Sequence, residues 1–404
     1  MPGERRYVWI VLPDETAAIP CGLLEASMGR RWHFAYGRRY AARRDAISLS
    51  PDFPLDTALR GQWLEPLPGD ALPAAIADVG PGRWGEYLLE KRLGRPAKPI
   101  EGLLATGAAR IGALLFSEGP NRPPDLGIGD TLPLERLPDI ANSVASLETA
   151  DDIPQRYRFA LERGPSVGGQ RPKADFHDAQ GQLWIAKFSS HKDHIPDHPR
   201  LEAFGLALAA ACGIVVPEFK LVSVAERPVL LLKRFDRQAD GRREHLLSAR
   251  TLLSIPESRI DLDGSYPALA ETLRRHSQDA ADSHRWFDRM VFNILIGNTD
   301  DHPLNHLFGW DGQRLRLMPA FDLEACGGRD EHRHQMRITP DSLIGDVPAA
   351  LSVCAEFGLD RRRASARIGQ LRQTIAGHWA PLAQRLQCSA AATAVIRRSL
   401  RHAD

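Results

Sequence analysis

The stretch that begins at Asn298 constrains the fold more than any other part of this 404-residue chain. Apolar residues in the preceding segment, 281–296, recur at intervals of three and four. This spacing predicts a buried helix that ends at Gly297. A polar loop carrying Asp300 then starts at a rigid helix end.

A hairpin is expected to follow that loop. Two short runs, His306–Trp310 and Arg314–Met318, flank Asp311-Gly312, a strong signal for a two-residue turn. The chain would therefore fold back and return Asp322 towards Asn305.

Three polar residues in this region have the spacing of phosphoryl-transfer sites. In protein kinases an Asp-x-x-x-x-Asn loop and a later Asp supply the base and the Mg²⁺ ligands. Asp300, Asn305 and Asp322 fit these positions. The alternative is that they only cap turns, and small-molecule phosphotransferases use the same spacing.

A phosphate loop and a lysine precede this region. The stretch Ser166–Lys173 contains two adjacent glycines, which allow backbone N–H groups to approach phosphate. Two strands are expected after it, at Ala174–His177 and Gln182–Phe188, with Lys187 near the end of the second.

Lys187 lies on a predicted strand whose two faces are both largely apolar, as in the middle of a sheet. An unpaired lysine is costly to bury there, which favours a phosphate-binding role. The alternative is a strand-end lysine that reaches water. Glu202, in a predicted helix Leu201–Cys212, would orient Lys187, or it is an ordinary first-turn glutamate favoured by the helix dipole.

Short stretches along nearly the whole chain share one family pattern. They are 166–174, 184–187, 232–237, 296–302 and 319–322 in the C-terminal part, and 48–51, 84–89 and 110–116 in the N-terminal part. Through them the chain resembles the HipA-type serine/threonine kinases, the toxins of type II toxin–antitoxin modules.

The resemblance implies roles for the loop residues. Asp300 would be the catalytic base, assisted by Lys187, which contacts the ATP phosphates. Asn305 and Asp322 would bind Mg²⁺. His302 would support the loop through hydrogen bonds.

The resemblance also implies a nucleotide site. Its residues would be Val167, Gly168, Gly169 and Gln170 in the phosphate loop, and Lys233, Arg234 and Phe235 in a hinge that meets adenine mainly through backbone groups. Lys233 stands where relatives often carry glutamate. Ser166 matches a position of autophosphorylation that silences the kinase; its alternative is a serine that stabilises a turn.

The expected fold is α+β: a two-lobed protein-kinase-like, HipA-like core with a preceding strand-rich N-terminal domain and a helical C-terminal lobe. The expected boundaries are 1–118 for the N-terminal domain, 119–141 for a Pro/Gly-rich linker, 142–240 for the nucleotide-binding lobe and 241–404 for the helical catalytic lobe. Helices are expected near 266–277, 281–296, 349–356, 360–377 and 379–400.

Composition agrees with a cytoplasmic enzyme. Five scattered cysteines without Cys-x-x-Cys spacing argue against a disulfide framework or structural zinc. The N-terminal apolar run is too short for a signal peptide or membrane span. A net charge of +1 gives no drive towards nucleic acid, so DNA is expected only indirectly, through an antitoxin.

The expected function is an ATP- and Mg²⁺-dependent protein kinase. The family suggests a host protein substrate, such as an aminoacyl-tRNA synthetase, whose phosphorylation inhibits translation and growth, and a helix-turn-helix antitoxin partner. Two alternatives stay open: a small-molecule phosphotransferase, and a catalytically weak module that binds the antitoxin as a corepressor.

Overall fold

The computed structural model describes residues 4–27, 31–121, 123–126, 131–147, 171–190, 197–238, 240–325 and 332–400. The predicted phosphate-loop residues Ser166–Gln170 lie outside them. The chain forms two compact units: unit 1 is Met1–His191, Leu231–Leu247 and Gly309–Gln313, and unit 2 is Lys192–Leu230, Ser248–Phe308 and Arg314–Asp404.

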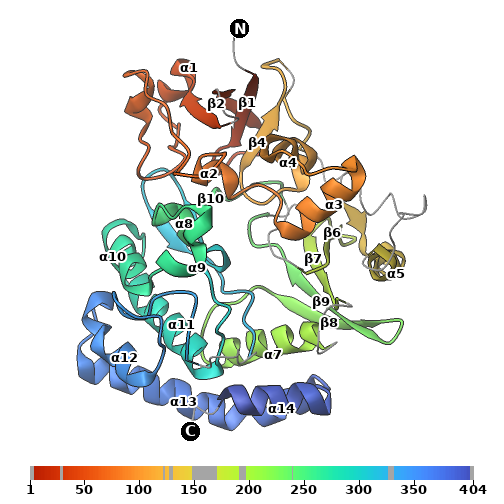
Figure 1. Ribbon diagram of the computed structural model, residues 1–404, viewed down its shortest axis with the longest axis vertical. Coiled ribbons are helices and arrows are strands. Elements are labelled where there is room, and N and C mark those ends of the chain that lie inside the picture. Colours follow the sequence, from red (N-terminus) through yellow and green to blue (C-terminus); the bar gives the residue numbers. More distant parts are fainter. Residues whose placement is uncertain are drawn as a thin grey trace. The chain divides into compact units, whose positions relative to one another are not determined.

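Unit 1 contains an antiparallel sheet of order β3-β2-β1-β4 (Figure 1). Its strands are β1 (Arg5–Val11), β2 (Ala18–Ala26), β3 (Trp32–Tyr36) and β4 (Leu114–Ser117). Alternating residues such as Val8, Ile10 and Leu114 are fully buried and form the core of this part. Its helices are α1 (Arg38–Ala41), α2 (Ala74–Ala77), α3 (Arg83–Leu93) and α4 (Pro99–Ala105).

A second sheet has the order β5-β6-β7-β9-β8. Its strands are β5 (Leu132–Pro133), β6 (Lys173–His177), β7 (Leu183–Phe188), β8 (Phe219–Val224) and β9 (Arg227–Lys233), and α5 (Leu137–Leu147) follows β5. The two strands predicted around Lys187 are confirmed as β6 and β7, and β7 has a neighbour on both sides, as its apolar faces predict. The chain passes from unit 2 to unit 1 within β9.

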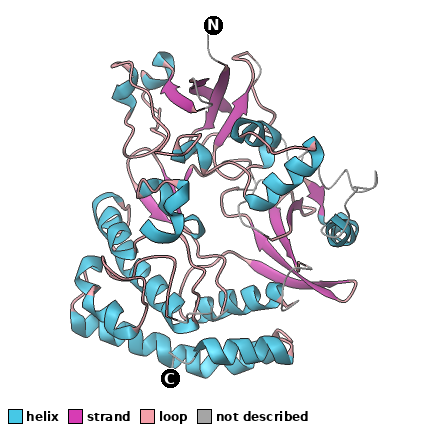
Figure 2. Cartoon of the chain, in the orientation of Figure 1, coloured by secondary structure: helices cyan, strands magenta, loops and turns pink. Residues whose placement is uncertain are grey.

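Unit 2 is mainly helical, as Figure 2 shows by its colours. Its helices are α7 (His198–Ala211), α8 (Ala249–Leu252), α9 (Ile260–Asp263), α10 (Tyr266–His276), α11 (Asp282–Ile296), α12 (Val347–Ser352), α13 (Arg361–Arg385) and α14 (Ala390–Ser399). Helix α11 is the core element, because Trp286, Phe287 and Met290 are fully buried. No helix in the described ranges is long and apolar enough to cross a membrane.

The predicted helices near 266–277 and 281–296 are confirmed as α10 and α11. Gly297 ends α11 with φ +65°, a left-handed conformation that favours glycine. The predicted break near residue 378 is wrong, because α13 continues through Pro381 to Arg385. Leu382 and Ala383 are buried in that last part, so packing overrides the local preference for a break.

The predicted hairpin is confirmed. Strands β11 (Leu307–Trp310) and β12 (Leu315–Leu317) are neighbours in a sheet of order β10-β11-β12, where β10 is Leu246–Ser248. Gly312 has φ +93°, which explains the glycine in the turn.

His245 and Trp310 fix a loop of the N-terminal region within unit 1. His245 Nε2 donates to the carbonyl of Leu49 at 2.9 Å, and Trp310 Nε1 donates to that of Ser48 at 2.9 Å. Burial lowers the pKa of His245 to about 4, although its bond to Leu49 works in the opposite direction. The imidazole is therefore neutral in the folded protein at pH 7.

This burial predicts an acid-sensitive fold. His245 binds a proton near its usual pKa of 6.5 when unfolded but only near pH 4 when folded, so stability falls as the pH drops between these values. We expect wild type to lose roughly 3 kcal/mol more unfolding free energy between pH 7 and pH 4 than His245→Gln loses. Urea unfolding at both pH values measures this, with the exposed His378→Gln as control. Equal losses in wild type and His245→Gln would contradict it.

Candidate active site

The candidate active site of unit 2 begins where α11 ends. Asn298 is buried, and its Nδ2 donates to Asn293 Oδ1 at 3.2 Å and to the carbonyl of Asp322 at 3.4 Å. One amide thus joins the helix end, the polar loop and the segment that follows the hairpin. The hairpin returns Asp322 to this loop, at Asn298, whereas the sequence predicted its return towards Asn305.

The two consecutive aspartates of the loop have opposite environments. Asp300 is exposed, and its Oδ1 accepts a bond from Gln335 Nε2 at 2.7 Å. Asp301 is only 1% exposed. The carboxylate predicted as the base is the one exposed to solvent.

Asp301 is the centre of a buried network. The Tyr266 hydroxyl donates to its Oδ2, and His306 Nε2 bonds the carboxylate at 3.0 Å. Asn293 Nδ2 in turn donates to the Tyr266 hydroxyl at 2.9 Å. These bonds link α10, α11 and the start of β11 to the loop.

The charges in this network follow from burial. Burial acts to raise the pKa of Asp301, but His306 and the two bonds outweigh it and hold that pKa below its usual value. Burial also lowers the pKa of His306, against the pull of Asp301. The pair is therefore an ionised carboxylate beside a neutral imidazole at neutral pH.

Asn305 and His302 lie on the same loop. Asn305 is buried at the end of the 3₁₀ helix η7 (Pro303–Asn305), and its backbone N donates to the carbonyl of His302 at 2.9 Å. Among the described residues, His302 Nδ1 has no hydrogen-bond partner. The Mg²⁺-binding role of Asn305 stays a prediction.

Asp322 is held by α7. Its φ is +57°, an uncommon conformation for a residue other than glycine, and its backbone N donates to Glu202 Oε1 at 3.2 Å. A Cβ on Gly205 would lie 1.9 Å from the carbonyl oxygen of Leu323, so glycine is required for this close approach. Glu202, predicted to orient Lys187, holds the Asp322 backbone; its role towards Lys187 stays a prediction.

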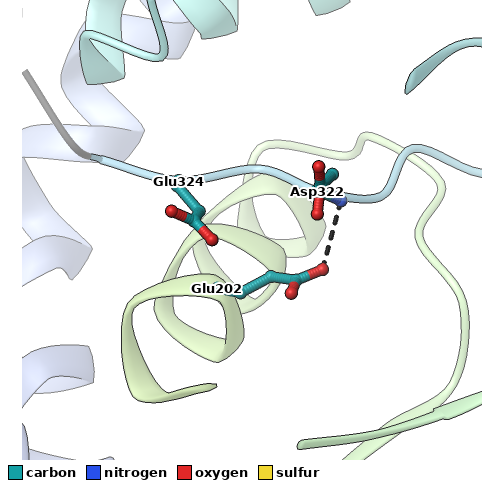
Figure 3. Close-up of side chains that lie close together, drawn as sticks. All are labelled: Glu202, Asp322 and Glu324. Carbon is teal, nitrogen blue, oxygen red and sulfur yellow. Dashed lines mark hydrogen bonds between the residues drawn. The ribbon is translucent and has the colours of Figure 1, made fainter. Parts of the chain in front are cut away.

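Three carboxylates gather at this point. Glu202, Asp322 and Glu324 each place an oxygen within 4.8 Å of the others, and Figure 3 shows Glu202 and Asp322 joined by the hydrogen bond. His198 Nδ1 bonds Glu324 Oε2 at 3.2 Å. Clustered carboxylate oxygens repel one another and are the ligands that Mg²⁺ prefers, so this donor set fits a divalent cation.

The sequence analysis missed several members of this site. Glu324 follows Asp322 by two residues and carried no spacing signal of its own. Asp301 and His306 stood inside the motif, but only the structure distinguishes the inward carboxylate from the exposed one. Tyr266 lies on a different helix, and nothing in the sequence connects it to the loop.

Lys187 belongs to unit 1, where it is half-buried on β7. Its partner across the strand pair is Lys173, which is buried on β6. The phosphate contact of Lys187 stays a prediction.

The predicted hinge also lies in unit 1. Arg234 is buried and makes two bonds to Asp236, at 2.9 and 2.7 Å, and others to the carbonyls of Ala109 and Arg110. Its guanidinium is therefore committed to the protein interior. The adenine contact of Lys233, Arg234 and Phe235 stays a prediction, and for Arg234 it is restricted to backbone groups.

Family models match both parts of the chain. The HipA N-terminal domain model matches residues 16–117, and the HipA-like C-terminal domain model matches residues 165–379, more than half of the chain. This chain belongs to the HipA family. Its kinase-like fold and its resemblance to HipA toxins, both predicted from the sequence, are thereby confirmed.

Two curated relatives come from Sinorhizobium fredii. The protein named "Putative kinase Y4mE" is 28% identical over 56% of this HipA-family chain and 58% of its own length. "Putative kinase Y4dM" is 27% identical over 75% of this chain and 74% of its own. The chain thus spans less than two thirds of the first relative.

One solved structure resembles almost the whole fold. HipA of Shewanella oneidensis, solved with HipB and its operator DNA, superposes with a TM-score of 0.68 over 98% of this chain and 95% of its own. The identity is 18%, so this likeness concerns the fold.

The Asp301 network predicts a stability cost for removing one hydroxyl. Tyr266→Phe deprives a buried carboxylate of a donor and Asn293 of an acceptor, so we expect a loss of about 1–3 kcal/mol in unfolding free energy. Urea unfolding measures it. Tyr7→Phe is the control, because the Tyr7 hydroxyl has no hydrogen-bond partner among the described residues. Equal stability of the two variants would contradict the network.

Proposed function

We propose that this protein is an ATP- and Mg²⁺-dependent serine/threonine protein kinase that acts as a HipA-like toxin. The observation that carries this proposal is that two adjacent carboxylates have different environments. Asp301 is bonded in the interior while Asp300 faces solvent from the same loop. A fixed base at an open position is what phosphoryl transfer to a hydroxyl requires.

Asp300 would act as the base. It would accept the proton that the substrate hydroxyl loses as the new P–O bond forms and the bond to ADP breaks. The bond from Gln335 would orient the Asp300 carboxylate. The Asp301 bonds would keep the loop from shifting during this step.

Asp322 and Asn305 would hold Mg²⁺, with Glu202 and Glu324 nearby. The cation would neutralise charge on the phosphates when bound. Glu202 would accept a bond from the backbone N of Asp322 and so fix the direction of the Asp322 carboxylate. The strained φ of Asp322 supports a functional role, because such strain persists mostly at functional sites.

The remaining nucleotide contacts extend the proposal to unit 1. Lys187 would bind phosphate oxygens, and Lys233–Phe235 would meet adenine through the backbone. Val167–Gln170 would cradle the phosphates. Ser166 would be the site at which autophosphorylation silences the enzyme.

The partner and the substrate are proposed by family likeness. HipA of Shewanella oneidensis is solved with HipB and operator DNA. We extend this to a helix-turn-helix antitoxin for the present chain, with DNA bound only through it. The substrate would be a serine or threonine of a cytoplasmic host protein, such as an aminoacyl-tRNA synthetase, whose modification inhibits translation and growth.

Variants of Asp300 and Asp322 should affect different steps, the first phosphoryl transfer and the second binding. Asp300→Asn removes the base and should lower kcat about 100-fold or more with ATP affinity nearly unchanged. Asp322→Ala removes a metal ligand and should weaken both Mg²⁺ and ATP binding. Kinase assays and nucleotide-binding titrations measure these effects, with Asp341→Asn, an exposed aspartate of the same unit, as control. Unchanged turnover in Asp300→Asn would refute the assigned base.

The substrate class is tested with γ-labelled ATP, Mg²⁺ and host-cell lysate. We expect wild type, but not Asp300→Asn, to label a distinct host protein on serine or threonine, identified by mass spectrometry. Label on a small molecule alone would establish a small-molecule phosphotransferase instead. Antitoxin binding without label on any molecule would establish the corepressor module.

A further inference from the structure

Unit 1 contains a buried group of arginines with too few carboxylates. Arg110, Arg234, Arg237 and Arg243 are all at most 8% exposed, and the aspartates coupled to them are Asp175 and Asp236. Within the described ranges, four cations thus face two anions, which leaves two positive charges uncompensated. A buried charge is costly unless it is paired, which makes this surplus a feature to explain.

Two of the arginines are well satisfied. Arg234 makes a two-pronged bond to Asp236. Arg237 Nη1 donates to Asp236 Oδ2 at 2.9 Å and to the carbonyl of Gly112 at 2.8 Å. Gly112 N also donates to Asp236 at 2.9 Å. Arg234, Arg237 and the backbone N of Gly112 therefore compensate the charge of Asp236.

Arg243 is the unsatisfied member. It is 7% exposed, and within the described part of the chain its guanidinium makes no hydrogen bond, with Nη1 fully enclosed. Arg110, 1% exposed, uses Nε and Nη2 on the carbonyls of Gly107 and Leu103, while its Nη1 has no partner there. Burial, followed by the repulsion from neighbouring arginines, lowers the pKa of Arg243 to about 10 and that of Arg110 to about 9.

A partly open cavity of about 60 Å³ lies beside Arg243. Its polar lining includes Arg237, Arg243, Thr131, Gln182 and Gln238. Arg237 and Arg243 are opposite each other in an antiparallel bridge, so both guanidiniums start from the same place in the fold. Every lining residue belongs to unit 1, and none is among the predicted nucleotide-binding residues.

We propose that this cavity, named here the Arg243 site, binds a phosphate group, either as inorganic phosphate or as a phosphomonoester. The arginines Arg243 and Arg237 would hold it, and the amides of Gln182 and Gln238 would add neutral donors. Arginine presents paired N–H donors that match phosphate oxygens.

Charge selects phosphate over a carboxylate. A phosphomonoester carries about −1.5 to −2 at pH 7, so it would compensate Arg243 and part of the wider positive surplus, whereas a carboxylate carries only one negative charge. The nearby carboxylate of Asp178 is not part of the lining. It accepts bonds from the backbone N of Gln182, from that of Gln180 and from Trp184 Nε1, which fixes its own turn.

Calorimetric titration of the full chain with inorganic phosphate tests the proposal. A saturating non-hydrolysable ATP analogue and Mg²⁺ are present throughout, so that phosphate does not occupy the predicted nucleotide site. We expect saturable binding that Arg243→Gln weakens by at least about tenfold. The matched control is Arg242→Gln, whose half-exposed side chain pairs with Asp240 and Asp14 and should change affinity less than about twofold. No saturable binding, or equal affinity in Arg243→Gln, would overturn the proposal.

Thermal unfolding separates binding from folding. Without phosphate, Arg243→Gln should unfold at the same temperature as wild type or higher, because it removes a buried charge that lacks a partner. Phosphate should raise Tm for wild type and Arg242→Gln but not for Arg243→Gln. A lower Tm of Arg243→Gln without phosphate, or the same phosphate-induced rise in all three proteins, would show that Arg243 is structural and would overturn the site.

Phosphoserine is a second ligand, which distinguishes a site for free phosphate from a site for a phosphorylated molecule. Binding of phosphoserine as well as phosphate would support a site that reads the phosphoryl group of a larger ligand. Binding of phosphate alone would support a site for the free ion.

Discussion

The candidate active site depends on one buried negative charge, that of Asp301. Placing a carboxylate in the interior is expensive, and here the Tyr266 hydroxyl and His306 offset the cost, so that the pKa of Asp301 lies below its usual value. Its partners are Tyr266 in α10 and His306, the residue before β11, so one ionised group joins α10 to both ends of the loop that follows α11. The exposed Asp300, the neighbouring residue of the loop, is held by this arrangement together with its own bond from Gln335.

A second constraint acts on Asp322. Helix α7 approaches the segment after the hairpin so closely that Gly205 has no room for a side chain, and Glu202 holds the backbone N of Asp322. This contact keeps Asp322 in a left-handed conformation that it would otherwise rarely adopt. The carboxylates gathered there repel one another, so the arrangement is suited to a cation more than to an empty interior.

The sequence predicted the elements better than the connections between them. Apolar periodicity and the turn at Gly312 were local signals, and both α11 and the hairpin have the predicted positions. The break expected near residue 378 failed because buried Leu382 stabilises α13 beyond Pro381, and such tertiary packing is not visible in local propensity. Glu324 and Tyr266 were missed for the same reason, since each acts across a distance in sequence that spacing rules do not cover.

Net charge gives the least information about this protein, because the whole chain carries only +1. The informative quantities are local: unit 2 gathers Glu202, Asp322 and Glu324, whereas the described part of unit 1 buries more arginines than the two aspartates beside them can balance. Neither excess of like charge stabilises the fold by itself, because each raises the free energy of the folded state. A bound ion of the opposite sign lowers it, and mass action then makes occupancy and stability rise together. A cation would relieve the repulsion among the carboxylates of unit 2 for the same physical reason that an anion would relieve the uncompensated charge of Arg243.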